Sequence, residues 1–307
     1  MTDVLWGNLL HLSYNMWEDH PVEARHGLHG YLPDLTFEYE LAKDILARMS
    51  EVGMNLAVID VGDGIEYESH PEISVNGAWT IDRMKKELAR IREMGLEPIP
   101  KLNFAATHDA WLGPYARCVS TDAYYAVCKD LVAEVIAIFD RPRFFHLGMD
   151  EENAEHQRHH HYVVVRQFDL WWHDFYLLVD QVQEGGSRPW IWSDYLWQHP
   201  DLFYQKMPKE VVQSNWYYGN EFNEEIAEVK AYRELEEHGY DQIPTGSNHS
   251  HPENFGLTVD HCKQVVSPER LLGFLQTIWR PTIEPYRRRF MESVEQVGEA
   301  IGKNRED

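Results

Sequence analysis

Short apolar segments alternate with longer amphipathic segments along the whole chain, and this alternation constrains the fold more than any single motif. The segment Thr36–Val52 is typical of the longer type, because Leu41 and Ile45 fall on one face at helical spacing. Gly53 follows at the position where many helices end in a left-handed residue. The next segment, Asn55–Val61, is a largely apolar run that is typical of a buried strand. The same pairing of helix and strand recurs to the end of the chain.

Eight strands are expected, and most of them are followed by a helix. The strands are predicted at Leu9–Trp17, Asn55–Val61, Glu97–Phe104, Arg143–Met149, Trp190–Tyr195, Glu210–Tyr217, Gln242–Ser247 and Leu271–Trp279. The helices are predicted at Thr36–Val52, Thr80–Met94, Thr121–Phe139, Tyr162–Gln183, Glu224–His238 and Ile283–Ile301. The helices after strands five and seven are expected to be short or irregular. Alternating strands and helices favour a parallel sheet, and eight such units favour a closed barrel, so we predict a single (β/α)8 TIM barrel domain over residues 1–307.

The rival α/β architecture is a doubly wound open sheet. That fold usually has a glycine-rich phosphate-binding turn after its first strand. The nearest candidate, Gly62-Asp63-Gly64, follows the second predicted strand and lacks the required spacing. The pattern therefore favours the barrel.

The charge of the chain narrows the class of partner. It has 28 Lys and Arg against 51 Asp and Glu, a formal net charge of −23. Nucleic acids and anionic membranes attract clustered basic residues, so neither partner is expected. Cys118, Cys128 and Cys262 offer no zinc-site or disulfide spacing. No secretory signal or membrane span is evident, so we expect a cytoplasmic protein that acts on a small molecule without a cofactor; an oligomer stays open.

In a barrel of this type, functional residues gather at the carboxyl ends of the strands. The predicted strand ends are rich in aromatic rings, amides and imidazoles. The polar and aromatic residues at these ends are His11, Tyr14, Asn15, Trp17, Asp60, Asp63, Lys101, Asn103, His108, His146, Asp150, Glu151, Trp192, Asp194, Trp197, Asn215, Trp216, Tyr217, Asn248, His249, His251, Gln276 and Trp279. Flat aromatic faces pack against sugar rings, and polar side chains bind hydroxyls, so a small glycoside or oligosaccharide is the expected ligand.

Strand four carries the most specific signal, the segment HLGMDEE at residues 146–152. Side chains alternate along a strand, so His146, Gly148 and Asp150 are expected to face the barrel axis, while Glu151 leans over the mouth. Repulsion and partial burial would raise the pKa of one of these two adjacent acids. A carboxyl that stays protonated near neutral pH can act as a general acid. The alternative is an ordinary solvated acidic loop.

The same segment resembles the strand-four motif of glycoside hydrolase family 20, the β-N-acetylhexosaminidases, which reads His–apolar–Gly–small–Asp–Glu. Four further segments are similar to parts of that family in the same order. They are Glu97–Trp111, Pro189–Asp194, Val211–Tyr218 and Leu271–Trp279. The resemblance covers most of the predicted barrel.

The resemblance implies a retaining exo-glycosidase that acts by substrate-assisted catalysis. The acetamido oxygen of the substrate would attack the anomeric carbon; Asp150 would orient that group, and Glu151 would act as acid and then base. Tyr217 would bind the acetamide, Trp192, Trp216 and Trp279 would wall the pocket, and His146 and His108 would support the carboxylates. Together with the strand ends, this gives the expected substrate-binding set His108, His146, Trp192, Asp194, Trp216, Tyr217, Trp279 and Asn103.

Several positions depart from the family pattern. The family usually has an arginine after strand one, where this chain has HLSYNMW at residues 11–17. Gly219 stands near the place of a usual aspartate, and Arg280 and Pro281 follow the last tryptophan where a carboxylate is usual. With strand one expected from about residue 9, the small domain that commonly precedes the barrel is expected to be absent. These departures indicate retained chemistry on a different, or differently bound, sugar.

Two other functions stay open. Histidines and carboxylates at strand ends could bind Mn²⁺ or Mg²⁺ in a sugar isomerase or epimerase, although clear carboxylate candidates come only from strands two and four. A sugar-binding barrel without catalysis is the second alternative. The cluster His156, His159, His160 and His161 could bind a metal or lie in a loop over the pocket. Lys101 could form a Schiff base, but a pairing with Asp60 or another inward carboxylate is favoured.

Overall fold

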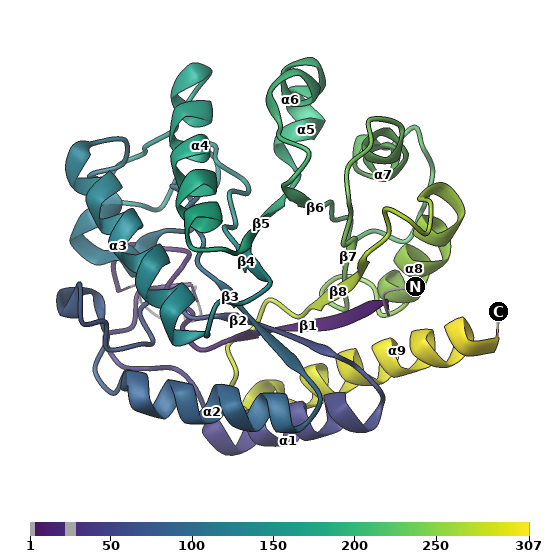
Figure 1. Ribbon diagram of the computed structural model, residues 1–307, viewed down its shortest axis with the longest axis horizontal. Coiled ribbons are helices and arrows are strands. Elements are labelled where there is room, and N and C mark those ends of the chain that lie inside the picture. Colours follow the sequence, from purple (N-terminus) through teal and green to yellow (C-terminus); the bar gives the residue numbers. More distant parts are fainter. Residues whose placement is uncertain (1–3, 22–28, 307) are drawn as a thin grey trace.

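Eight parallel strands form a barrel, as the sequence predicted. The computed structural model describes residues 4–21 and 29–306, and Figure 1 shows the strands at the centre of the molecule. The strands are β1 (Leu5–His11), β2 (Leu56–Asp60), β3 (Glu97–Lys101), β4 (Phe144–His146), β5 (Arg188–Trp192), β6 (Val212–Ser214), β7 (Thr245–Ser247) and β8 (Gly273–Thr277). Their order in the sheet is β6-β5-β4-β3-β2-β1-β8-β7, with every ladder parallel.

The two ends of this order, β6 and β7, meet through backbone hydrogen bonds. Gln213 N donates to Asp241 O at 3.0 Å, and Ile243 N donates to Gln213 O at 2.9 Å. Further along, Thr245 N donates to Asn215 O at 2.9 Å. The short β6 and β7 strands therefore still close the barrel, which leaves no free sheet edge between them.

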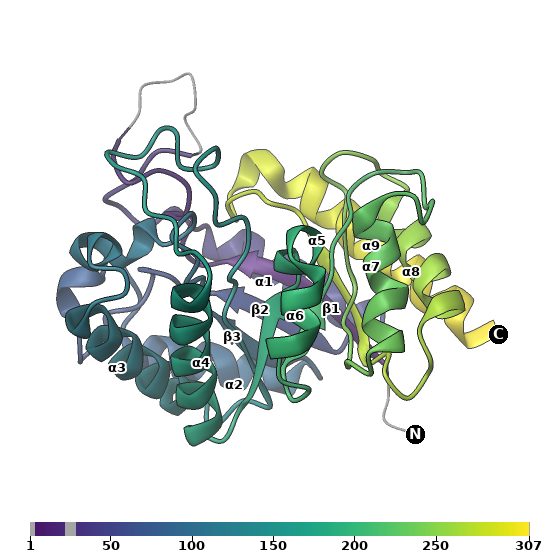
Figure 2. The same ribbon diagram turned by 90° about the horizontal axis from the view of Figure 1, so that it is seen from above.

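Helices follow the strands and lie outside the barrel, as Figures 1 and 2 show from two directions. They are α1 (Tyr39–Glu51), α2 (Ile81–Glu93), α3 (Asp122–Ile138), α4 (Asp169–Glu184), α5 (Tyr195–Gln198), α6 (Pro200–Lys206), α7 (Ala227–Glu237), α8 (Asn254–Val265) and α9 (Arg287–Glu306). Three short 3₁₀ helices are η1 (Pro71–Ile73), η2 (Ala110–Arg117) and η3 (Glu284–Tyr286). Among the described residues, no helix is both long and apolar enough to cross a membrane.

Some predicted boundaries are wrong. The first strand is Leu5–His11 and not Leu9–Trp17. Leu12 and Met16 are buried although they lie in the loop after β1, so the apolar pattern continued beyond the strand. The fourth predicted helix begins at Asp169, seven residues later than expected. The helices after β5 are short, as predicted, but α8 after β7 is a regular helix of 12 residues.

The barrel interior is apolar at its centre and becomes polar toward the carboxyl ends of the strands. The inward cluster includes Leu9, Val58, Ile99, Trp190 and Leu275, all of them fully buried. A second, larger cluster joins the outer strand faces to the helices. Removing a buried tryptophan side chain typically costs about 3–5 kcal/mol, so Trp190 is a major contributor to barrel stability. Beyond this apolar cluster, toward the carboxyl ends of the strands, lie buried polar side chains such as Asp60 and Lys101.

Candidate active site at the carboxyl ends of the strands

A buried polar layer forms the floor of the site. Lys101, at the end of β3, makes an ion pair with Asp60, at the end of β2, and both side chains are buried. His11 Nδ1 at the end of β1 lies 3.5 Å from Asp60 Oδ2. Burial alone would raise the pKa of Asp60, but the interactions with Lys101 and His11 together outweigh it and lower that pKa. The pairing of Lys101 with Asp60, favoured by the sequence, is confirmed.

The turn after β4 sets the direction of the two acidic side chains. Gly148 has φ +70°, and a Cβ atom at this position would lie 2.0 Å from Asn103 Oδ1. Asn103 Oδ1 accepts the backbone N–H groups of Ala105 and Met149, both at 3.1 Å. Its amide nitrogen donates to Asp150 Oδ1 at 2.7 Å. Only glycine fits this contact, because it lacks a Cβ and tolerates the left-handed conformation. Asn103 therefore binds both the turn and Asp150.

Asp150 and Glu151 lie beside one imidazole. His108 Nε2 lies 3.2 Å from Glu151 Oε2 and 3.5 Å from Asp150 Oδ2. His156 Nε2 lies 3.5 Å from the other oxygen of Glu151. The Asp150 side chain is 8% exposed, whereas the Glu151 side chain is 24% exposed and lines a cavity of about 420 Å³. One acid is thus enclosed, while the other borders a cavity whose lining includes Asp194 and Trp171 but none of the predicted tryptophans.

The electrostatics of the site differ from the sequence expectation. Burial opposes ionisation of Glu151, but its hydrogen bond to His108 and the charge of that imidazole lower its pKa. The pKa of His108 is raised, since the attraction of Asp150 and Glu151 exceeds the effect of burial. The pKa of Asp194 is raised to about 8 by burial and then by the charge of Asp150. Asp194, a third acid of the site, therefore keeps its proton at neutral pH.

Aromatic side chains from three loops border the carboxylates. The Trp279 ring lies 5.9 Å from Trp192 and 6.3 Å from Trp17, measured between ring centroids. Trp17 also packs edge-on against His108 at 4.9 Å. Trp216 stacks on Tyr218 at 5.0 Å. Trp192 and Trp17 thus both pack against Trp279, and Trp216 is linked to Trp279 through Tyr218.

The tyrosine that faces this aromatic group is Tyr218. Its hydroxyl accepts a hydrogen bond from Trp279 Nε1 at 2.9 Å, and the charges of Asp150 and Glu151 act on it. Tyr217 packs instead against Phe222 in the outer cluster. The physical reason is alternation after β6, which turns Trp216 and Tyr218 inward and Tyr217 outward.

Two other predicted residues have roles that differ from direct support of the carboxylates. His146 Nδ1 accepts the backbone N–H of Gly148 at 3.0 Å, and its ring packs at 4.3 Å from Trp192. Burial lowers the pKa of His146 well below its usual value, so the ring is neutral and shapes the turn. Asp194 Oδ2 accepts the backbone N–H of Glu151 at 2.8 Å.

From the sequence, Trp17 was expected only as one of the strand-end residues, and Tyr218 was not selected. Alternation counted from Trp216 would have indicated Tyr218.

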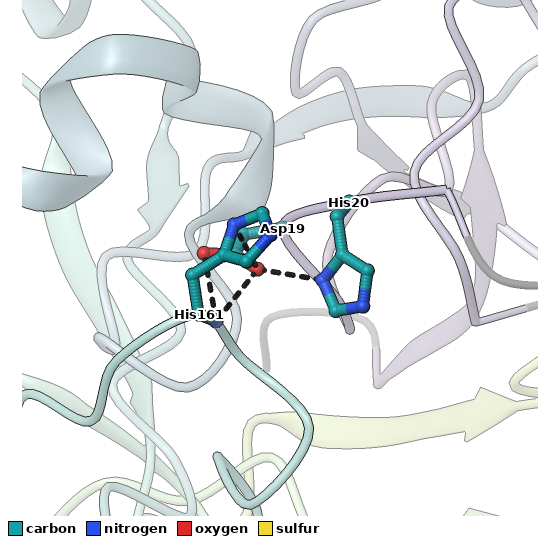
Figure 3. Close-up of side chains that lie close together, drawn as sticks. All are labelled: Asp19, His20 and His161. Atoms are coloured by element: carbon teal, nitrogen blue, oxygen red, sulfur yellow. Dashed lines mark hydrogen bonds and ion pairs between the residues drawn. The ribbon is translucent and has the colours of Figure 1, made fainter.

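Two groups of side chains within the described residues could hold a metal ion. In the first, His108, Asp150 and Glu151 each present a ligand atom, and these atoms lie within 4.8 Å of one another. The second, shown in Figure 3, joins Asp19 and His20 of the β1 loop to His161 of the β4 loop. There, Arg117 lies 2.6 Å from Asp19 and donates to His161 Nδ1 at 2.8 Å. Because Arg117 engages two of the three candidate ligands, this second group acts as an ion-paired latch between the loops.

The histidine cluster of residues 156–161 lies in turns and not on a helix. His156 approaches Glu151, and His161 belongs to the latch. His160 is partly buried, and the charges of Asp19 and Glu18 act on it. The cluster therefore forms part of the loop over the site.

Several solved structures have the same fold. The chain matches the GH20 exo-β-N-acetylglucosaminidase of Vibrio harveyi, solved in complex with N-acetylglucosamine, with 14% identity and a TM-score of 0.64 over 95% of this chain and 54% of that one. It matches the β-N-acetylhexosaminidase of Bacteroides fragilis with 15% identity and a TM-score of 0.65 over 95% of this chain and 65% of that one. The GH20 β-N-acetylhexosaminidase of Streptomyces coelicolor gives 14% identity and a TM-score of 0.65 over 97% and 65%.

The chain spans between about half and two thirds of the length of these three proteins. No protein-family model matches its sequence, and no curated protein matches it. The likeness is thus one of fold at low identity, and it extends over nearly the whole of this chain: the protein is a TIM barrel with the architecture of the matched part of the GH20 β-N-acetylhexosaminidases.

Proposed function

We propose that this protein is a retaining exo-glycosidase that hydrolyses a β-linked hexosaminide or a related small glycoside. The observation that carries the proposal is the acid pair itself. Asp150 is enclosed and bound by Asn103, while Glu151 borders a cavity and contacts His108. Two adjacent carboxyl groups held in such different surroundings suit two different roles in one reaction. The fold shared with GH20 β-N-acetylhexosaminidases supports the same conclusion.

In this proposal Asp150 acts on the substrate's own acetamido group. Asn103 engages Oδ1 of Asp150, and Oδ2, which lies 3.5 Å from His108 Nε2, is the oxygen that would accept the acetamido N–H. The acetamido oxygen then attacks the anomeric carbon, and a cyclic oxazolinium ion forms as the leaving group departs. The negative charge of Asp150 stabilises the positive charge that develops on that ring. Water later opens the ring and restores the anomeric configuration.

Glu151 exchanges protons with the leaving group and with water. At rest, the proton of the His108–Glu151 pair stays on the imidazole, since the pKa of His108 is raised and that of Glu151 is lowered. A bound glycoside displaces water from the cavity and disfavours the charged pair, so the proton moves to Glu151. Glu151 then protonates the glycosidic oxygen and afterwards takes a proton from the attacking water.

The aromatic residues form the sugar pocket. The half-buried Trp216 and Trp279 would present apolar surface to the pyranose, and Trp17 adds a wall from the β1 loop. The buried Trp192 packs against Trp279 and supports it. Tyr218 replaces Tyr217 as the proposed hydrogen-bond partner of the acetamide, because its hydroxyl is close to the acid pair and to Trp279. The usual arginine, aspartate and carboxylate of the family are absent at the matching positions, so we propose a sugar that is bound differently from N-acetylglucosamine.

A screen of nitrophenyl glycosides tests the proposal. We expect turnover of a 2-acetamido glycoside, inhibition by a thiazoline analogue of the cyclic intermediate, and loss of about 10²–10⁴-fold in kcat for Glu151→Gln with little change in KM. Glu155→Gln, in an exposed part of the same loop, is the matched control and should keep wild-type kcat. Wild-type turnover by Glu151→Gln would remove Glu151 from the acid role.

A metal-dependent isomerase is the second candidate, because His108, Asp150 and Glu151 offer three convergent ligand atoms. Its weakness is that Asp60, the carboxylate of β2, is already paired with Lys101. A single carboxylate-rich strand end is a poor octahedral site for Mg²⁺ or Mn²⁺. Chelation with EDTA separates the two candidates: sugar isomerisation that stops on chelation would favour the metal enzyme, and unchanged glycoside hydrolysis would favour the glycosidase.

A further inference from the structure

Glu151 has an unusual backbone conformation for an acid residue. Its φ is +53°, in the left-handed region that L-residues other than glycine seldom adopt. A residue other than glycine is strained in this region, and the conformation persists only when its surroundings hold it there. The conformation matters here because it decides where the Glu151 carboxyl points relative to Asp150.

Side chains from both neighbouring loops hold the two peptide groups of Glu151. On one side, its C=O accepts from Thr107 Oγ1 at 2.8 Å and from the backbone N–H of Asn153 at 2.7 Å. On the other side, its N–H donates to Asp194 Oδ2 at 2.8 Å. The C=O of Glu151 thus accepts two hydrogen bonds. Its N–H, in contrast, donates to Asp194 alone among the described residues.

Asp194 is itself placed by the end of β5. It follows Trp192 and Ser193, which are fully buried, and it stands directly before the short helix α5. Its Oδ1 atom is buried and has no hydrogen-bond partner among the described residues. A lone acceptor of a strained peptide N–H, with its second oxygen unused, is a costly arrangement for a residue that only supports the fold.

We propose that Asp194 is a positioning residue for catalysis: by accepting the peptide N–H of Glu151, it fixes the left-handed conformation that aims the Glu151 carboxyl at the glycosidic oxygen. This inference rests on the proposed function and deepens it, since it gives Asp194 a role other than sugar binding. The charged groups that act on Asp194 are Asp150 and Glu151, both from the β4 loop. A neutral Asp194 avoids a third negative charge beside this pair.

Two substitutions separate positioning from the presence of an acid. Asp194→Asn keeps an oxygen that can accept the Glu151 N–H and resembles the protonated carboxyl in shape. Asp194→Ala removes the acceptor. We expect kcat of Asp194→Ala to fall about 10–100-fold with KM nearly unchanged, because a misplacement of about 1 Å has an effect of this size. Asp194→Asn should stay within about 3-fold of wild type. Asp201→Ala, at an exposed acid of α6, is the matched control.

Amide hydrogen exchange at Glu151 gives a readout that does not depend on turnover. Exchange should accelerate in Asp194→Ala and stay slow in Asp194→Asn. If Asp194→Ala does not fold, Asp194→Ser serves in its place, since its shorter hydroxyl cannot reach the N–H at 2.8 Å. Unchanged exchange at Glu151 in the variant without the acceptor would overturn the proposal, as would equal losses of kcat in the alanine and asparagine variants.

Different experimental results would contradict the role of Asp194 and the proposed glycosidase activity. Absence of turnover by the wild-type protein on every glycoside would count against the glycosidase, while exchange at Glu151 would still test the hydrogen bond. Turnover by the wild type together with full kcat in Asp194→Ala would sink the inference and leave the glycosidase intact.

Discussion

At the scale of single residues, Asp194 links the site to the stability of the fold. Its pKa is raised from 3.8 to about 8, so the folded chain keeps a proton that the unfolded chain releases above pH 4. Between these values the unfolded state binds fewer protons, and stability falls as pH rises. We expect the Tm of Asp194→Asn relative to wild type to increase from pH 5 to pH 8, as measured by thermal denaturation. A Tm difference that is constant over this range would contradict the raised pKa.

The tyrosine pair after β6 gives a second prediction at this scale. Tyr218→Phe removes a hydroxyl near Asp150 and should lower kcat/KM on 2-acetamido glycosides about 10–100-fold, because a hydrogen bond to a charged group is worth about 1.5–3 kcal/mol. Tyr217→Phe is the matched control, because that ring packs against Phe222 away from the acid pair. Kinetics of both variants on one substrate measure the difference. An equal loss in the two variants would count against Tyr218 as the acetamide partner.

The same pair shows what the sequence could and could not predict about the site. The motif around Asp150 and Glu151 and the strand-end position of His108 and Asn103 follow from residue types and their order, and these four side chains do lie together. The choice between adjacent tyrosines depends on where alternation begins, and one residue of uncertainty reverses it. A raised pKa was expected for one acid of the pair, but the pKa of Glu151 is lowered and that of Asp194 is raised, because pKa values depend on three-dimensional neighbours.

At the scale of elements, the β4 turn is the most demanding part of the barrel. Gly148 combines a left-handed φ with close contact to Asn103, whereas Gly186, after α4, has φ +85° and open space around it. Gly186→Ala should therefore cost only the conformational strain, roughly 1–2 kcal/mol. Gly148→Ala should cost more, because the added methyl collides with the side chain that holds Asp150. Urea unfolding of both variants tests this; equal losses would mean that the turn relaxes without penalty.

Element boundaries were the weaker part of the sequence prediction, and the reasons are physical. The loop after β1 buries Leu12 against the outer cluster and also buries Met16, so its apolar pattern resembles that of a strand. The loop before α4 contains Tyr162 and Val163, which are apolar yet exposed, and it was taken for the first turns of the helix. The local pattern of apolar residues indicates which positions are buried. It indicates a helix or a strand only where the buried residues also lie in regular secondary structure.

At the scale of the whole molecule, the order of helices and strands was sufficient to predict the barrel. What the pattern could not supply is how the barrel closes, since β6 and β7 are only three residues long and meet through a few backbone hydrogen bonds. The pieces of the site come from loops far apart in sequence, which are joined by contacts such as the latch of Asp19, Arg117 and His161. Such contacts have no local signature in the chain.

The net charge of −23 also acts at this scale, because it makes the overall electrostatic field of the protein negative. A glycoside that carries an anionic substituent, such as a sulfate, should be disfavoured relative to its neutral parent at low ionic strength. Salt screens this repulsion over a Debye length of about 10 Å at 0.1 M, so the ratio of kcat/KM between the two substrates should narrow from 10 mM to 300 mM NaCl. The neutral glycoside is the internal control, since its kcat/KM should change little. A ratio that does not depend on salt would place the discrimination in contacts within the pocket instead of in the field of the whole protein.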